Sequence, residues 1–187
     1  MAAEAKRRLS PDRFHHVEGV VEAARALAER FGVDPAAAER AAWLHDVYRE
    51  TAADELKRLA ASAGIKLPEG PAEVWHGPVC AALMPAEFGI ADPAVRAAVE
   101  HHTAGHPEMD ALAQVLFVAD AIEPGRAYPG VEELRRAAAS GLRLATALAA
   151  DASIAHLLRE RRTIVWQTVA LRNRLWLEIG GVQAVVQ

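Results

Sequence analysis

Residues 112–122 read LAQVLFVADAI and carry apolar side chains around almost the whole circumference of a helix. A helix that is apolar on every side is buried inside a protein, because no face of it favours contact with water. The pattern ends at Glu123-Pro124-Gly125-Arg126, where proline and glycine interrupt it. The sequence therefore predicts a central buried helix over this segment, with other helices packed around it.

The rest of the chain divides into helix-length segments whose ends are marked by proline, glycine and capping residues. Residues 11–31 repeat apolar side chains at the helical period, and Gly32 provides a C-terminal stop. Asp-Pro pairs at 34–35 and 92–93 combine an N-cap with proline at the first helical position. Another helix is expected to open at 76–78. These signals predict helices that follow one another with short connections.

No segment shows the sustained alternation of a β-strand, so we expect an all-α bundle of about seven to nine helices. Thr51 and Asp54 resemble the capping box of one of these helices. The C-terminal part is rich in Ala and Leu and shows no shift in composition that would mark a second domain. The expected organisation is one domain over 1–187, with a motif-bearing core over about 11–130, C-terminal helices over about 131–180 and fraying over 180–187.

Charge and cysteine content exclude several classes of protein. The chain has 21 basic and 25 acidic residues, a net charge of −4, and no block of like charges. Binding to nucleic acid or to an anionic membrane through non-specific charge is therefore not expected. Cys80 is the single cysteine, which fits a reducing compartment and a small buried side chain. The longest dense apolar stretch, 115–119, is too short to span a membrane, so we expect a soluble cytoplasmic protein.

Two pairs of adjacent histidines indicate which polar side chains face inward. Successive residues of a helix are about 100° apart, so Val17 and the apolar face around it leave His16 near the edge of that face and His15 almost opposite. In the helix that follows the second Asp-Pro pair, His102 lies along the apolar stripe and His101 lies well away from it. The second histidine of each pair is the one expected to face inward.

Two carboxylates also occupy apolar surroundings. His45-Asp46 closes a helix whose preceding face is rich in alanine, and Asp120 ends the apolar run of the central helix. An isolated buried carboxylate is energetically costly and needs a partner. A salt bridge, a helix cap or simple exposure at the helix end would each explain Asp120 by itself.

Six polar side chains near helix ends together form a candidate metal-binding set: His16, His45, Asp46, His76, His102 and Asp120. Imidazole nitrogens and carboxylate oxygens without a thiolate suit two hard or borderline divalent ions, with one aspartate bridging them. Structural zinc is disfavoured, because such sites are usually closed by four ligands rich in cysteine. The set predicts a catalytic centre with two metal ions.

This ordered set resembles the HD-domain metal-dependent phosphohydrolases, which carry a His, a His-Asp pair and a distant Asp on a helical bundle. Within them, the wider sequence resembles the YqeK-type symmetrical bis(5'-nucleosyl)-tetraphosphatases over about residues 11–175. The matching segments are RFHHV (13–17), WLHD (43–46), HGPV (76–79), HHTAG (101–105), VADAIEPGR (118–126), PGVEEL (129–134) and LRN (171–173). The resemblance implies a single HD domain in which the six side chains hold two divalent ions, often iron; the ligand types also admit manganese, zinc or cobalt.

The resemblance also implies an activity. It is the symmetrical hydrolysis of diadenosine tetraphosphate and related dinucleoside polyphosphates to two ADP, by a hydroxide that two metal ions activate. The expected catalytic residues are Asp46, His102 and Arg126. Arg126 follows a Pro-Gly turn six residues after Asp120, so its guanidinium can reach a phosphate, with an ordinary surface arginine as the alternative. The expected substrate-binding residues are Arg13, Arg49, Thr103, Gly105, His106 and Arg126.

Some of these expected substrate-binding residues have alternative explanations. Thr103 and Gly105 are equally explained by a turn that ends a helix. Arg49 and His106 stand where the family usually has lysine and arginine, so substrate affinity or pH dependence is expected to differ. Trp75 is a candidate for lining an adenine pocket, with core packing as the alternative.

Two rival functions also remain at this point. One is an HD phosphohydrolase that acts on another nucleotide or alarmone. The other is an HD module that binds a nucleotide or a protein without catalysis. The oligomeric state is open between a monomer and a homodimer.

Overall fold

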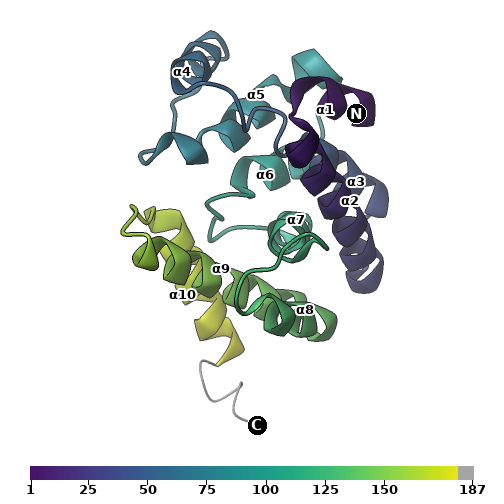
Figure 1. Cartoon of the computed structure of the whole chain (residues 1–187), viewed down its shortest axis with the longest axis vertical. Helices are drawn as coiled ribbons and strands as arrows, with labels where there is room; N and C mark the ends of the chain where they lie inside the picture. The colour runs from purple at the N-terminus through teal and green to yellow at the C-terminus, as the bar shows by residue number, and fades with distance from the viewer. Residues whose placement is uncertain (181–187) are drawn as a thin grey trace.

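The computed structural model describes residues 1–180, and within them every regular element is helical (Figure 1). The elements are α1 (Ala2–Arg8), α2 (Pro11–Phe31), α3 (Pro35–Leu44), α4 (Ala53–Ser62), the 3₁₀ helix η1 (Ala72–Val74), α5 (His76–Phe88), α6 (Pro93–His101), α7 (Ala111–Ile122), α8 (Val131–Ser140), α9 (Leu142–Arg159) and α10 (Trp166–Ile179). The all-α expectation is confirmed. The helices outnumber the expected seven to nine, in part because the charged N-terminal stretch also forms one.

Helix α7 is the centre of the fold, as its sequence predicts. Its residues from Leu112 to Ala119 are buried without interruption. Helices α2, α6 and α9 pack against it, and Figure 1 shows α7 nearly end-on between the α2–α3 pair and the C-terminal helices. Burial on all sides explains why this segment carries no amphipathic pattern.

Most of the expected helix ends are confirmed. Helix α2 begins at Pro11, and the side chain of Ser10 accepts a hydrogen bond from the backbone N–H of Arg13. It ends at Gly32, which has the positive φ of 69° that glycine adopts without strain. The two Asp-Pro pairs also behave as caps, since Asp34 and Asp92 each accept from a backbone N–H two residues later.

The capping box expected at Thr51 does not form, and that prediction is wrong. Helix α4 begins at Ala53 without a side-chain cap, and the backbone N–H of Thr51 donates to the carbonyl of Tyr48. A series of turns over residues 45–50 continues beyond α3 and includes Thr51 in its last hydrogen bond. Local turn bonds of this kind compete with a cap for the same backbone groups.

The packing brings together helix ends that are far apart in the sequence. Helix α3 contacts both α6 and α7, α2 lies against α3 and α7, and α5 lies against α6. The C-terminal ends of α3 and α6, the N-terminal end of α5, one side of α2 and the last turn of α7 therefore converge. Helices α8 and α9 pack onto the other side of α7, and α10 packs against α9 (Figure 1).

Among the described residues, no helix has both the length and the apolar character needed to cross a bilayer. The fraying expected over 180–187 concerns residues that, apart from Gly180, lie outside the described part of the chain.

Candidate metal centre

Asp46 lies at the middle of the converging helix ends, just beyond the C-terminus of α3, and is only 4% exposed. Its Oδ1 atom is 3.1 Å from Nε2 of His76 and 3.5 Å from Nε2 of His102. Its Oδ2 atom is 3.5 Å from Nε2 of His45 and 3.8 Å from Nε2 of His16. One carboxylate is therefore shared by two pairs of histidines, and each pair with Asp46 forms a group compact enough to hold one metal ion.

Three of the four imidazoles are oriented in the same way by the backbone. Nδ1 of His45 is 2.7 Å from the carbonyl oxygen of Ala42, Nδ1 of His76 is 2.8 Å from that of Glu73, and Nδ1 of His102 is 2.7 Å from that of Val99. In each case the partner lies three residues earlier in the chain. A carbonyl oxygen only accepts hydrogen bonds, so Nδ1 carries the proton and the lone pair of the neutral ring lies on Nε2.

These lone pairs face one another without hydrogens between them. The Nε2 atoms of His76 and His102 are 3.0 Å apart, and those of His16 and His45 are buried without a hydrogen-bond partner. Burial lowers the pKa of His45 to about 4 and also lowers the pKa of His76, so protonation is disfavoured at both. Buried acceptors that converge in this way need a cation, and the donor set fits divalent metal ions.

Asp120 extends the cluster on the side of α2 and α7. Its Oδ1 atom is 3.1 Å from Nε2 of His16 and accepts a hydrogen bond of 2.6 Å from Nη2 of Arg126. Burial alone would raise the pKa of Asp120, but its close contact with His16 and the positive charge of Arg126 outweigh burial and lower that pKa. The carboxylate is thus held ionised beside the histidines, as a metal ligand must be. All six side chains of the candidate set lie in one cluster.

Glu123 is a member of the site that the sequence did not single out. Its side chain is buried, with Oε1 3.2 Å from Nδ1 of His16 and Oε2 accepting a 2.5 Å hydrogen bond from the backbone N–H of Gly125. Glu123 orients His16 as the backbone carbonyls orient the other three rings. A glycine in the middle of α2 was the available signal, since a Cβ atom at Gly19 would lie 2.6 Å from Glu123 Oε2.

Replacing Glu123 by glutamine is expected to lower kcat/KM for the metal-dependent activity by about 10- to 100-fold, the usual effect of losing an orienting partner of a metal ligand. Glutamine keeps the shape but removes the charge that orients His16. Metal titration would measure the affinity for the ions, and steady-state kinetics would measure kcat/KM. Glu29→Gln, an exposed substitution on the same helix as His16, serves as control. Unchanged metal affinity and rate in the Glu123 variant would contradict this role.

Four of the predicted substrate-binding residues lie beside the cluster. The hydroxyl of Thr103 is 2.9 Å from Nε2 of His102, and Nη1 of Arg13 donates to Oδ2 of Asp46 at 3.1 Å. Nη1 of Arg49 donates to the carbonyl of Glu73, and Arg126 is bound to Asp120. Their hydroxyl and guanidinium groups surround the cluster with hydrogen-bond donors.

The other substrate-binding predictions find less support. Gly105 has a φ of 68°, and its backbone N–H donates to the carbonyl of His101, so this glycine closes the turn that follows α6 instead of offering a free N–H. His106 stacks on His101, with ring centroids 4.7 Å apart, and is not among the residues that line a cavity beside the cluster. Trp75 donates to the carbonyl of Pro68 and is likewise absent from the cavity wall.

The helical-angle predictions for the paired histidines are confirmed. The side chain of His15 is 86% exposed, whereas that of His16 is 11% exposed. His102 is buried and His101 is partly exposed.

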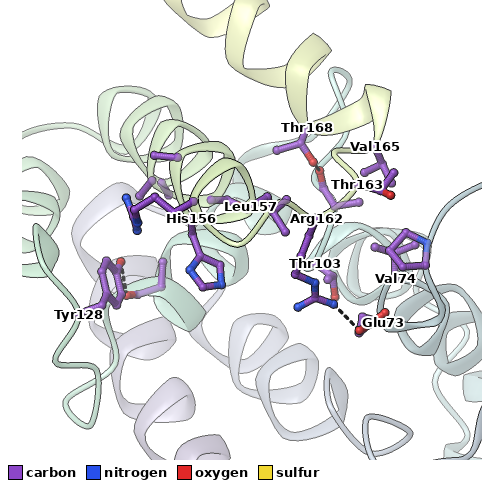
Figure 2. A pocket seen from close by; sticks show the side chains of 18 of the residues that line it. Glu73, Val74, Thr103, Tyr128, His156, Leu157, Arg162, Thr163, Val165 and Thr168 are labelled. Carbon is purple, nitrogen blue, oxygen red and sulfur yellow. Dashed lines mark hydrogen bonds and ion pairs between the residues drawn. The ribbon is translucent and has the colours of Figure 1, made fainter.

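A cavity of about 600 Å³ adjoins the cluster. Arg49, Thr103 and Arg126 line it on the side of the histidines and aspartates. The end of α9 with the segment that follows lines another side, and residues around η1 and in the loop before α8 complete the wall (Figure 2). His156, to which the sequence assigned no role, is part of that wall. Its position follows from the packing of α9 and had no local signal in the sequence.

The comparisons with known proteins agree with this geometry. The model of the family described as HD domain matches residues 13–125. The chain is 36% identical to a Bacillus subtilis protein over 94% of this chain and 95% of that protein, and 38% identical to a Staphylococcus aureus protein over 70% and 69%. Both relatives are named bis(5'-nucleosyl)-tetraphosphatase, symmetrical.

A solved structure is similar over nearly the whole chain. It is the crystal structure of a predicted HD superfamily hydrolase involved in NAD metabolism from Clostridium acetobutylicum, with a TM-score of 0.90, 29% identity and coverage of 95% of each chain. The chain therefore belongs to the HD domain family, and within it to the group that includes the relatives named as symmetrical tetraphosphatases.

Proposed function

We propose that this protein hydrolyses diadenosine tetraphosphate and related dinucleoside polyphosphates symmetrically, with two ADP as the products from the former. The observation that carries this proposal is the carboxylate of Asp46, shared by two pairs of histidines next to an arginine-lined cavity. The names of the relatives from Bacillus subtilis and Staphylococcus aureus support the same activity.

The side chains of the cluster would hold the metal ions, and the side chains around it would bind phosphate. His16, His45, His76, His102, Asp46 and Asp120 would hold two divalent ions, which we propose to be iron. Bound there, such ions supply Lewis acidity for phosphoryl transfer to water. The metal ligands sit in a buried site, where the charge of each bound group acts strongly on the phosphate.

The arginines position the substrate. Arg126 keeps donors free beyond its bonds to Asp120, because a guanidinium has five N–H groups, and it can present them to a phosphate oxygen. Arg49 and the hydroxyl of Thr103 line the same cavity and can bind neighbouring phosphate oxygens. Arg13 lies against Asp46, where it fixes the shared carboxylate.

Product analysis tests the proposal directly. The protein, purified without chelator and supplied with Fe²⁺, Mn²⁺, Co²⁺ or Zn²⁺ in turn, is incubated with diadenosine tetraphosphate, and the nucleotides are separated by ion-exchange chromatography. ADP alone is the expected product. ATP with AMP would contradict symmetrical cleavage, and no turnover alongside rapid hydrolysis of a phosphomonoester would favour another nucleotide substrate. Elemental analysis of the same preparation is expected to show about two ions per chain.

If the protein is instead a non-catalytic HD module, it should bind the nucleotide but show no turnover with any of the metals. The cytoplasmic location and the choice between monomer and homodimer stay predictions of the sequence.

A further inference from the structure

The part of the chain beyond the HD match completes the cavity. Residues 13–125 match the HD domain and contain all six candidate metal ligands. The wall of the cavity away from them includes three basic side chains from the last turns of α9 and the segment after it: His156, Arg159 and Arg162. In Figure 2 the side chains of His156 and Arg162 extend from this segment into the cavity.

The charge of the cavity wall strongly favours an anion. Four arginines line it, and two of them, Arg49 and Arg126, already belong to the side of the metal centre. Glu73 is the one acidic side chain among the lining residues, and it is bound to Arg162. Arg159 and Arg162, at the end of α9 and in the segment after it, therefore form a second positive region, separate in sequence from the first and facing the same space.

The end of α9 is shaped so that Arg162 turns back into the cavity. The helix ends at Arg159, and Arg161 adopts a φ of 53°, in the left-handed region that usually needs glycine. This reversal is closed by a 2.8 Å hydrogen bond from the backbone N–H of Arg162 to the carbonyl of Leu157. The guanidinium then reaches the carboxylate of Glu73 on η1, so this ion pair joins two parts of the cavity wall that are far apart in the sequence.

We propose that His156, Arg159 and Arg162 form a second anion subsite, which binds the phosphates of the substrate half that lies away from the metal centre. The inference rests on the proposed function, because only a substrate with anionic groups on both sides of the cleaved bond uses both regions. Guanidinium groups suit this task, since each donates two parallel hydrogen bonds to a phosphate. The imidazole of His156 adds an N–H donor.

Glu73 acts as the internal occupant of this subsite. Its carboxylate takes the place on Arg162 that a substrate phosphate needs, so binding exchanges one anionic partner for another. The two side chains are each 44% exposed, so the pair is open to solvent and weak enough to exchange. The backbone carbonyl of Glu73, which holds Arg49 and His76, does not take part in the exchange.

The test compares a long substrate with a short one. For each variant, kcat/KM is measured for diadenosine tetraphosphate and for bis(4-nitrophenyl) phosphate, which has a single anionic group. In the double variant His156→Ala with Arg162→Ala, the ratio of the two values is expected to fall by about tenfold or more, the loss typical of a charge-assisted hydrogen bond. Most of the change should come from a higher KM for the long substrate. The ratio for Arg162→Lys should lie between those of the wild type and the double variant, because lysine keeps the charge but lacks the planar guanidinium.

Two further variants test the direction of the change in this ratio and provide a control. Glu73→Gln removes the competing carboxylate, so the same ratio should rise. Arg143→Ala removes an exposed arginine from the other end of α9, outside the cavity wall, and should leave the ratio unchanged. An unchanged ratio in the double variant, or an equal fall in Arg143→Ala, would overturn the subsite.

A binding experiment separates this inference from the proposed function. Calorimetric titration of the metal-loaded protein with inorganic tripolyphosphate needs no turnover. Weaker binding by the double variant, together with tighter binding by Glu73→Gln, would support the subsite even if diadenosine tetraphosphate were not cleaved. Equal affinity in the wild type and both variants would refute it, whatever the substrate.

Discussion

Replacing Asp46 by alanine is expected to abolish the binding of both metal ions and to reduce turnover by about 1,000-fold or more. Asp46 is the one ligand that faces both pairs of histidines, so its loss opens both positions at once. Bound ions of this kind contribute about 4 kcal/mol or more to stabilising a transition state, which corresponds to such a factor. Elemental analysis of the purified variant and turnover with added metal would measure the two effects.

A substitution of another acidic residue provides the control for the Asp46 variant. Asp151→Asn alters a half-buried aspartate that bonds to Arg172 and Trp176 between α9 and α10. It is expected to cost some stability and to leave the metal content at the wild-type value. If the Asp46 variant retained both ions, or turned over substrate at the wild-type rate, the cluster would not be a metal centre with a shared ligand.

Gly77→Ala is expected to unfold the protein at lower temperature and to remove one of the two ions. A Cβ atom at Gly77 would lie 2.7 Å from the carbonyl oxygen of Val99, 3.0 Å from that of Glu100 and 3.2 Å from Nδ1 of His102. Two of these three contacts are with backbone, which cannot rotate away. Helices α5 and α6 must therefore move apart, at a cost of about 2–3 kcal/mol, or a fall in Tm of about 5–10 °C.

The position of the clash determines which ion is lost. Val99 is the residue whose carbonyl orients His102, and His76 precedes Gly77 directly, so the pair on α5 and α6 separates. The pair formed by His16 and His45 lies on other helices and should keep its ion. A metal content that falls from two to one, measured beside Tm by scanning calorimetry, is the expected result.

Gly141→Ala provides the matched control for this experiment. A Cβ atom at Gly141 would meet nothing within 4 Å, and its φ of −173° is accessible to alanine. Its Tm and metal content should match the wild type. A Gly77 variant that behaved in the same way would show that α5 and α6 do not need this close approach.

The fold was predictable because its signals are local. Pro11, Gly32 and the Asp-Pro pairs act on the backbone within a few residues, so the helix ends they mark were found correctly. The central helix was equally clear, since its apolar character does not depend on its partners. Thr51 failed because a turn that follows α3 competes for its backbone N–H, and the sequence gives no measure of that competition.

The sequence predicted which six side chains cluster, but it predicted less of what surrounds them. Helical angles placed His16 and His102 inward, the positions of the other four near helix ends grouped them with these two, and the resemblance to the family agreed with the set. Glu123 depends on the space left by Gly19 on another helix, and a glycine within a helix does not by itself indicate which side chain fills that space. His156 and Arg162 enter the cavity only because α9 packs against α7 and its end folds back toward η1. Contacts between distant segments decide these positions.

The way each imidazole is anchored has a consequence for mutational robustness. His45, His76 and His102 are aimed by carbonyl groups of the main chain, and every amino acid has a carbonyl. A deep mutational scan should therefore tolerate many substitutions at the three anchoring positions, limited by packing and, at Glu73, by the pairing of its side chain with Arg162. His16 relies on a side chain instead, so a single codon change at position 123 can loosen it. Laboratory evolution toward a different metal would find its easiest starting point at this fourth ring.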